Sequence, residues 1–129
     1  MTPIVFINGS KIPYVDLILS GKKKFETRTR NTLKALVGQR VYIAETGKGK
    51  PVIRCMATIG EPLKILTNAV WDAFRERTCV PVGSPFDWKP DTKIKWIYFL
   101  RDVTPVEPFT PPEGKRHGIV WMEYEGSDK

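Results

Sequence analysis

The residues best suited to do chemistry lie close together near the N-terminus, at positions 21–28. This stretch joins a lysine cluster to a carboxylate and a guanidinium, in the side chains of Lys23, Glu26 and Arg28. A carboxylate accepts hydrogen bonds from a polar heterocycle, and the planar fork of an arginine pairs phosphate oxygens two at a time. We interpret Lys23 as projecting from a turn, while Glu26 and Arg28 point from a strand into the same cleft, with Tyr14 as a wall.

A strand is expected to carry the carboxylate and the guanidinium. The β-branched and aromatic residues at positions 24–30 favour an extended backbone. The period of two then places Glu26, Arg28 and Arg30 on one face and Thr27 on the other. A purely structural explanation remains open, because lysines stabilise the end of a helix and Glu26 can neutralise Arg28 along the strand.

Positive charge is concentrated in the first half of the chain. The formal net charge is +7, from 21 Lys and Arg against 14 Asp and Glu. Residues 1–60 hold 11 basic and 3 acidic residues, a balance of +8, and the remainder holds 10 and 11, a balance of −1. Lys48 and Lys50 lie in a glycine-containing turn of the basic half. This asymmetry favours a polyanionic partner, although a basic and soluble surface would have the same composition.

Aromatic residues and cysteines add further candidates. Trp88 lies in an aperiodic, proline-rich loop at positions 80–91, where an aromatic side chain can stack on a base or pack across a barrel end. Cys55 alternates with apolar neighbours and is interpreted as a core residue. Because the other candidate ligands are Cys79 and the single His117, we expect no structural metal, no dense disulfide framework and no cofactor.

The apolar patterns predict a single α+β domain over residues 1–129. Two main helices are expected at 13–20 and 68–77, together with five or six strands. The strands are expected at 4–7, 24–30, 40–44, 51–58, 94–100 and 119–124. The chain has too many strands for a helix bundle and too few helices for a doubly wound sheet, so a small mixed β-barrel fits best.

The chain shows no sign of a membrane or secretory segment. No apolar run approaches the roughly 18 residues needed to cross a bilayer. The N-terminus also lacks the charged-then-apolar order of a signal peptide. We therefore expect a soluble, cytoplasmic protein.

Several of these segments together resemble a known family. A helix that ends in glycine, followed by x-Lys-x-x-Glu-x-Arg, resembles the signature of the ASCH (activating signal cointegrator homology) domain of the PUA-like superfamily. The matching residues are Gly21, Lys23, Glu26 and Arg28. Residues 13–20 resemble the family's first helix, and residues 37–43 resemble its Gly-Asp-x-Val strand entry, with Gln39 in place of the aspartate. Residues 96–105 and 114–121 resemble its last strands.

The resemblance implies a PUA-like mixed β-barrel of five or six strands with two main flanking helices and a cleft between barrel and helices. Related PUA-like domains bind RNA, so it also implies a protein that recognises RNA or a nucleotide by holding a base in a basic cleft. The residues expected at this interface are Lys23, Glu26, Arg28, Arg30, Lys48, Lys50, Tyr14 and Trp88.

Enzymatic alternatives follow from the same resemblance. One branch of the family hydrolyses N4-acetylcytidine with a lysine, a nucleophilic threonine and a distant glutamate, and another member is described as a ribonuclease. In an amidohydrolase Lys23 and Glu26 would be the catalytic residues, with Glu26 at the threonine's position and Glu76 a candidate for the distant acid. Thr27 is expected to face away, which favours binding over hydrolysis. A protein-interaction adaptor is a further alternative, using the exposed proline-rich segment 105–112, which is expected to form a turn.

Overall fold

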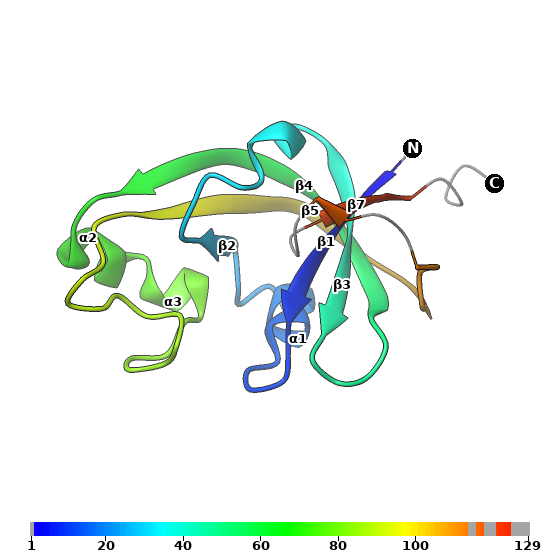
Figure 1. The fold of residues 1–129 in the computed structure, drawn as a ribbon, viewed down its shortest axis with the longest axis horizontal. Helices are drawn as coiled ribbons and strands as arrows, with labels where there is room; N and C mark the ends of the chain where they lie inside the picture. The colour runs from blue at the N-terminus through cyan, green and yellow to red at the C-terminus, as the bar shows by residue number, and fades with distance from the viewer. Residues whose placement is uncertain (1, 114–115, 118–120, 125–129) are drawn as a thin grey trace.

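The computed structural model describes residues 2–113, 116–117 and 121–124, which form a curled sheet with short helices beside it (Figure 1). Seven strands follow the order β2-β5-β4-β3-β1-β7-β6. They are β1 (Thr2–Asn8), β2 (Phe25–Arg28), β3 (Arg40–Thr46), β4 (Val52–Ile65), β5 (Lys95–Phe109), β6 (Arg116–His117) and β7 (Trp121–Tyr124). The helices are α1 (Tyr14–Leu19), the 3-10 helix η1 (Lys34–Leu36), α2 (Asn68–Ala73) and α3 (Arg75–Thr78).

Two long antiparallel strands, β4 and β5, form the spine of the sheet. Their register shifts at three places, and such bulges bend a strand and increase its twist. In Figure 1 the pair arches over β2, with α2 and α3 below the end of the arch that lies away from the termini. β1 and β3 pair in parallel while the other strand pairs are antiparallel, so the sheet is mixed.

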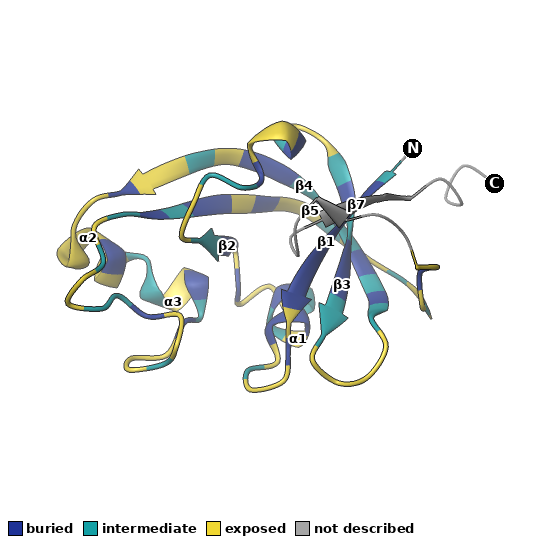
Figure 2. Ribbon diagram, viewed as in Figure 1, coloured by how far each residue is buried: buried dark blue, intermediate teal, exposed yellow. Residues whose placement is uncertain are grey.

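The main core lies between the curled sheet and α1. Buried and less buried residues alternate along most of β4, the pattern of a strand with one face on a core (Figure 2). Val15 and Ile18 are three residues apart on α1, share one side of the helix and are fully buried against this face. A second cluster fills the space between β2, β5 and α2. It contains Phe25, Ile65, Trp71, Val80 and Ile97.

The predicted α+β class with a curled, mixed sheet is confirmed, but several boundaries differ. The described part of the chain has seven strands, one more than the six expected ranges, because the two-residue β6 pairs antiparallel with β7, which lies within the strand expected at 119–124. The helix expected at 68–77 is broken at Phe74, which separates α2 from α3. The strand expected at 24–30 ends at Arg28, so Arg30 lies outside it.

The proline-rich segment 105–112 was expected to be a turn, and this prediction is wrong for its first half. Residues 105–109 belong to β5, where Pro105 lies opposite Cys55. The β4–β5 register shifts on both sides of that pair, and a bulged ladder tolerates a proline that donates no hydrogen bond. Among the described residues no helix has the length and apolar character needed to span a membrane.

Candidate functional site

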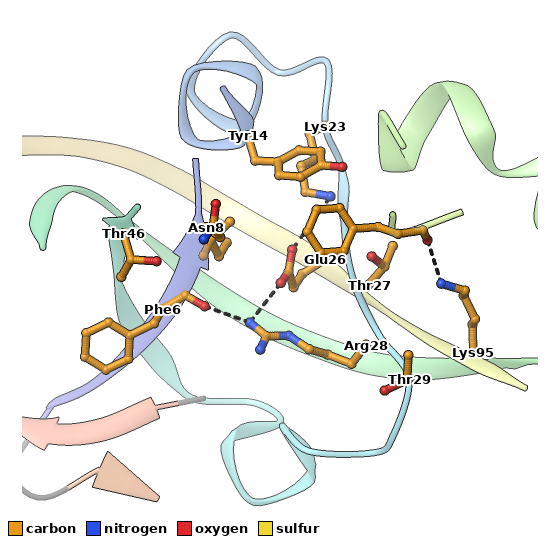
Figure 3. Close-up of a pocket in the computed structure, with 12 residues that line it drawn as sticks. Phe6, Asn8, Tyr14, Lys23, Glu26, Thr27, Arg28, Thr29, Thr46 and Lys95 are labelled. Atoms are coloured by element: carbon orange, nitrogen blue, oxygen red, sulfur yellow. Dashed lines mark hydrogen bonds and ion pairs between the residues drawn. The ribbon is translucent and has the colours of Figure 1, made fainter. Parts of the chain in front are cut away.

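A pocket of about 450 Å³ opens between β1 and β2, two strands that are not neighbours in the sheet (Figure 3). It is lined by Phe6, Ile7, Asn8, Tyr14, Lys23, Glu26, Thr27, Arg28, Thr29, Thr46, Phe86 and Lys95. Arg28 reaches across it from β2, and its Nη2 atom donates to the Phe6 carbonyl of β1 at 3.1 Å. The pocket therefore lies at the gap of the curled sheet, and one arginine bridges that gap.

Lys23, Glu26 and Arg28 form a connected group of charges in the pocket, which we call the charged floor. Glu26 Oε2 lies 2.8 Å from Arg28 Nη2, and Glu26 Oε1 lies 3.7 Å from Lys23 Nζ. Lys23 Nζ also donates to the Thr78 carbonyl at 2.8 Å. Lys23 is 2 % exposed and Glu26 6 %, so the carboxylate is a buried anion held between two cations. Such burial is tolerated only because the charges compensate one another.

The end of α1 directs Lys23 into the pocket. Gly21 has a φ of +81°, a conformation that residues with a side chain rarely adopt. The N–H groups of Lys22 and Lys23 both donate to the Leu17 carbonyl at 3.0 Å, which closes the helix and turns the chain toward β2. β2 then pairs antiparallel with β5, with Glu26 opposite Tyr98. Helix end and strand thus bring the two charged residues to the same place.

Burial controls the ionisation of the groups around the charged floor. Burial lowers the pKa of Lys23, and the negative charge of Glu26 opposes this shift. Lys23 Nζ also lies 4.6 Å from the centre of the Tyr14 ring, a cation–π contact. Burial, followed by the charge of Glu26, raises the pKa of Tyr14, so the phenol stays neutral. Within the described part of the chain the buried Tyr14 hydroxyl has no hydrogen-bond partner.

Two aromatic side chains form a wall of the pocket. The rings of Tyr14 and Phe86 meet edge to face, with centroids 6.1 Å apart. Tyr14 therefore lies where it was predicted. Trp88, for which stacking on a base and packing were both open, does not line the pocket: its ring packs against the second core cluster, with its centroid 6.5 Å from that of Trp71. The loop at 80–91 thus contributes its phenylalanine rather than its tryptophan.

The three outlying basic residues of the predicted interface lie outside the pocket. Arg30 is exposed beyond the end of β2, and Lys48 and Lys50 are exposed in the loop between β3 and β4. This loop nevertheless lies next to the pocket, because it begins directly after the pocket residue Thr46. The Thr46 carbonyl in turn accepts the N–H of Gly9, the residue after β1, at 2.8 Å. The two lysines therefore belong to the surface beside the pocket rather than to its lining.

The residues of the enzymatic alternative are only partly brought together. Lys23 and Glu26 are neighbours, but Glu76 is exposed on α3 and does not line the pocket. Thr27, expected on the opposite strand face, nevertheless lines the pocket, because the pocket lies beyond the free edge of β2 and reaches residues of both strand faces.

The cysteine and histidine residues are the candidate ligands for a structural metal. Cys55 is buried in β4 and Cys79 is partly exposed, and neither forms a disulfide. Among the described residues no three His, Cys, Asp or Glu side chains form a group that could hold a metal ion. The backbone of His117 belongs to β6, but its side chain lies outside the described part of the chain.

Sequence reasoning missed Phe86, Lys95, Asn8 and Thr46. Asn8 and Thr46 end the parallel strands β1 and β3 at paired positions, which an assignment of that pair would have revealed. Phe86 lies in the aperiodic loop at 80–91, where no periodicity shows which aromatic residue faces the pocket. Lys95 is buried at the start of β5, and its charge gave no sign of this.

Comparison with known proteins places this fold. No family model matches the chain, and no curated protein matches it. Among solved structures, the crystal structure of ASCH from Zymomonas mobilis superposes with a TM-score of 0.69 at 22% identity, covering 84% of this chain and 73% of that one. Two mutant structures of the same protein give TM-scores of 0.69 and 0.68 at 23% identity. The chain therefore has the ASCH fold, the PUA-like α+β architecture expected from the sequence.

Proposed function

We propose that this protein binds RNA or a nucleotide and holds a base in the pocket above the charged floor. The observation that carries the proposal is the buried Glu26 carboxylate at the base of a 450 Å³ pocket with aromatic walls. A carboxylate offers about four acceptor positions, and within the described part of the chain two cations form ion pairs with this one. The remaining positions suit the exocyclic amino group of cytosine, adenine or guanine rather than the edge of uracil, which has no amino group and carries its one edge N–H between two carbonyl oxygens.

The surface beside the pocket supplies charge for the rest of the ligand. Residues 1–60 carry a balance of +8, and the exposed Lys48 and Lys50 lie on a loop that contacts the pocket end of β1. Lysines on such a loop neutralise phosphates without reading sequence. A base in the pocket and phosphates along the loop would therefore divide recognition into a specific and a non-specific part.

An amidohydrolase acting on N4-acetylcytidine-like nucleosides is the second candidate. It is favoured by Lys23, because burial lowers the pKa of Lys23 although the charge of Glu26 opposes the shift, and a lowered pKa enlarges the fraction of neutral amine available for proton transfer. The exposed position of Glu76, outside the pocket, weighs against it. Binding without turnover is therefore the function that the geometry supports better.

The test is a filter-binding titration of the whole chain against mixed single-stranded RNA at 50 and 200 mM salt. Neutralising about four phosphates gives a slope of log K against log[salt] near −3. Lys48→Ala with Lys50→Ala should make the slope shallower by about 1.4, because two phosphate contacts are lost. Lys23→Ala should weaken binding at both salts with little change of slope, since Lys23 is buried in the pocket.

Lys22→Ala is the matched control, because Lys22 is exposed and does not line the pocket. It should change the slope by no more than one phosphate contact, about 0.7. Binding that is weak and unaffected by salt, by the double lysine variant and by Lys23→Ala would refute the proposal. The same RNA, recovered and run on a denaturing gel, should remain intact, whereas cleavage would favour a ribonuclease.

A further inference from the structure

Phe86 exposes an unusually large apolar side chain at the pocket. It is 41 % exposed and lines the pocket, while its ring touches Tyr14 only edge to face. Exposed single apolar residues are common on proteins and by themselves say little. The surroundings of this one are informative, because the backbone that carries it is held by buried charged groups.

The residue after Phe86 anchors the loop. Asp87 is buried, and its carboxylate accepts hydrogen bonds from the indole of Trp71 at 2.8 Å and from a guanidinium N–H of Arg75 at 2.9 Å. It also accepts the backbone N–H groups of Gly83 and Trp88, at 2.8 and 2.7 Å. Burial alone would raise the pKa of Asp87, but these hydrogen bonds outweigh it and lower the pKa, so the anchor stays charged.

A buried lysine fixes Phe86 itself. Lys95 Nζ donates to the Phe86 carbonyl at 2.6 Å and lies 4.9 Å from the centre of the Trp71 ring. Figure 3 shows this bond at one side of the pocket, across from Asn8. Burial of an ammonium and of a carboxylate costs desolvation free energy, and here both groups hold one short loop segment. The phenylalanine is therefore presented in a fixed position rather than on a mobile lid.

The chemistry of the charged floor limits what this ring can meet. A phosphate placed there would bring its negative charge toward the Glu26 carboxylate, which already balances Lys23 and Arg28. A flat, neutral ring with N–H groups on its edge avoids that repulsion and can cover apolar surface on its face. An aromatic side chain held rigidly loses little conformational entropy when such a ring stacks on it.

We propose that the pocket takes an unpaired nucleobase, with Phe86 as the preorganised stacking platform and Glu26 as the acceptor for the base edge. This inference rests on the proposed function and deepens it, because it names the residue that contacts the face of the base and requires that base to be unpaired. It also assigns the phosphates to the surface outside the pocket. A base inside a duplex is excluded as a ligand, since neither its face nor its pairing edge is available.

The experiment measures calorimetric affinities of the whole chain for AMP, CMP, GMP and UMP, with ribose 5-phosphate as the probe without a base. At least one nucleotide should bind, and ribose 5-phosphate should bind at least tenfold more weakly than that nucleotide. Phe86→Ala should weaken nucleotide binding about 5- to 150-fold, the range for loss of one base–aromatic stack. Phe86→Tyr should restore affinity to within about threefold, because the π-face is kept.

Two further variants distinguish the loss of the stacking ring from a general loss of folding. Phe86→Leu keeps apolar volume without a π-face and should bind as weakly as Phe86→Ala. Phe99→Ala is the matched control, because Phe99 is 39 % exposed and lies outside this pocket. It should bind like the wild type, and thermal melts should show that each variant is folded.

The outcomes separate the two proposals. If Phe86→Ala and Phe86→Leu bind like the wild type while Glu26→Gln loses affinity, the stacking role is refuted and the proposed function stands. If ribose 5-phosphate binds as tightly as the nucleotides, the pocket takes phosphate and the inference is overturned. If the wild type binds neither nucleotides nor mixed RNA, the proposed function fails and this inference fails with it.

Discussion

Replacing Glu26 with glutamine removes the anion that compensates two cations at the pocket floor, while the size of the side chain is kept. At an effective dielectric constant of about 20, Coulomb's law gives about 6 kcal/mol for the 2.8 Å pair with Arg28 and about 4.5 kcal/mol for the 3.7 Å pair with Lys23. Glutamine avoids the cost of desolvating a carboxylate, and this offsets several kcal/mol of the lost ion-pair energy.

The net loss is set by how well the two cations can recover. Removal of one partner from a buried ion pair costs about 3–5 kcal/mol. The Arg28 side chain is 17% exposed and regains some water, whereas the Lys23 side chain is 1% exposed and keeps the Thr78 carbonyl and the face of the Tyr14 ring. We therefore expect Glu26→Gln to lower the free energy of unfolding by about 3 kcal/mol at pH 7, the lower end of that range.

The loss should shrink as the pH rises. Lys23 already has a lowered pKa, and loss of the Glu26 charge lowers it further. Between that folded-state pKa and the ordinary value of 10.5, the unfolded chain binds more protons than the folded one, so stability rises with pH. The pKa of Tyr14 is raised and acts in the opposite direction, but only above its ordinary value of 10.0. The difference in the free energy of unfolding between the wild type and Glu26→Gln should thus be smaller at pH 9 than at pH 7.

The assay is urea unfolding at pH 7 and pH 9, followed by tryptophan fluorescence. Glu61→Gln removes an exposed carboxylate of β4 and should change stability by less than about 0.5 kcal/mol. The double variant Lys23→Met, Glu26→Gln should regain more than about 1 kcal/mol over Glu26→Gln, because the uncompensated buried ammonium is gone. A Glu26→Gln protein as stable as the wild type at pH 7 would refute this reasoning. A double variant less stable than Glu26→Gln would refute it as well.

Two further predictions concern the loop and the chemistry. Asp87→Asn should lower the free energy of unfolding by about 2 kcal/mol, because donors that met a carboxylate now meet an amide, and should expose the loop at 80–91 to limited proteolysis. The exposed Asp91→Asn is its control, and equal digestion of both variants would contradict the anchoring role. Incubation with N4-acetylcytidine should release no acetate above the blank, because this chain has a glutamate, Glu26, at the position where the sequence resemblance implies the nucleophilic threonine of the amidohydrolases. Acetate release that disappears in Lys23→Ala would instead establish the amidohydrolase.

The fold could be predicted where a periodic pattern coincided with a local stop signal. The first helix is one example, since its apolar residues and Gly21 mark both its buried side and its end. The apolar pattern predicted one helix across Phe74, where the structure has two. The residues of α2 and α3 keep a helical spacing in the sequence although the helix is broken at Phe74. The pattern also failed at Pro105, because a proline ends a regular strand but fits a bulged one, and a bulge depends on the partner strand.

The charged floor was accessible from sequence because its members are close in the chain. Glu26 and Arg28 are two residues apart on one strand, and Lys23 follows the helix end directly, so local geometry nearly suffices to bring them together. The aromatic wall was not accessible in this way. Whether Phe86 or Trp88 faces the pocket depends on Asp87 between them, whose hydrogen bonds to Trp71 and Arg75 orient the loop.

The position of the pocket depends on a relation that no local pattern contains. β1 and β2 lie far apart in the sheet order, yet the curl brings them to opposite sides of the pocket, where Arg28 bonds the Phe6 carbonyl. That curl arises from register shifts between β4 and β5, and neither of these strands was predicted at its full length. The same arginine pairs with Glu26. The side chain that bridges the gap of the sheet thus also holds the carboxylate proposed to read the base, so closure of the fold and formation of the site depend on one residue.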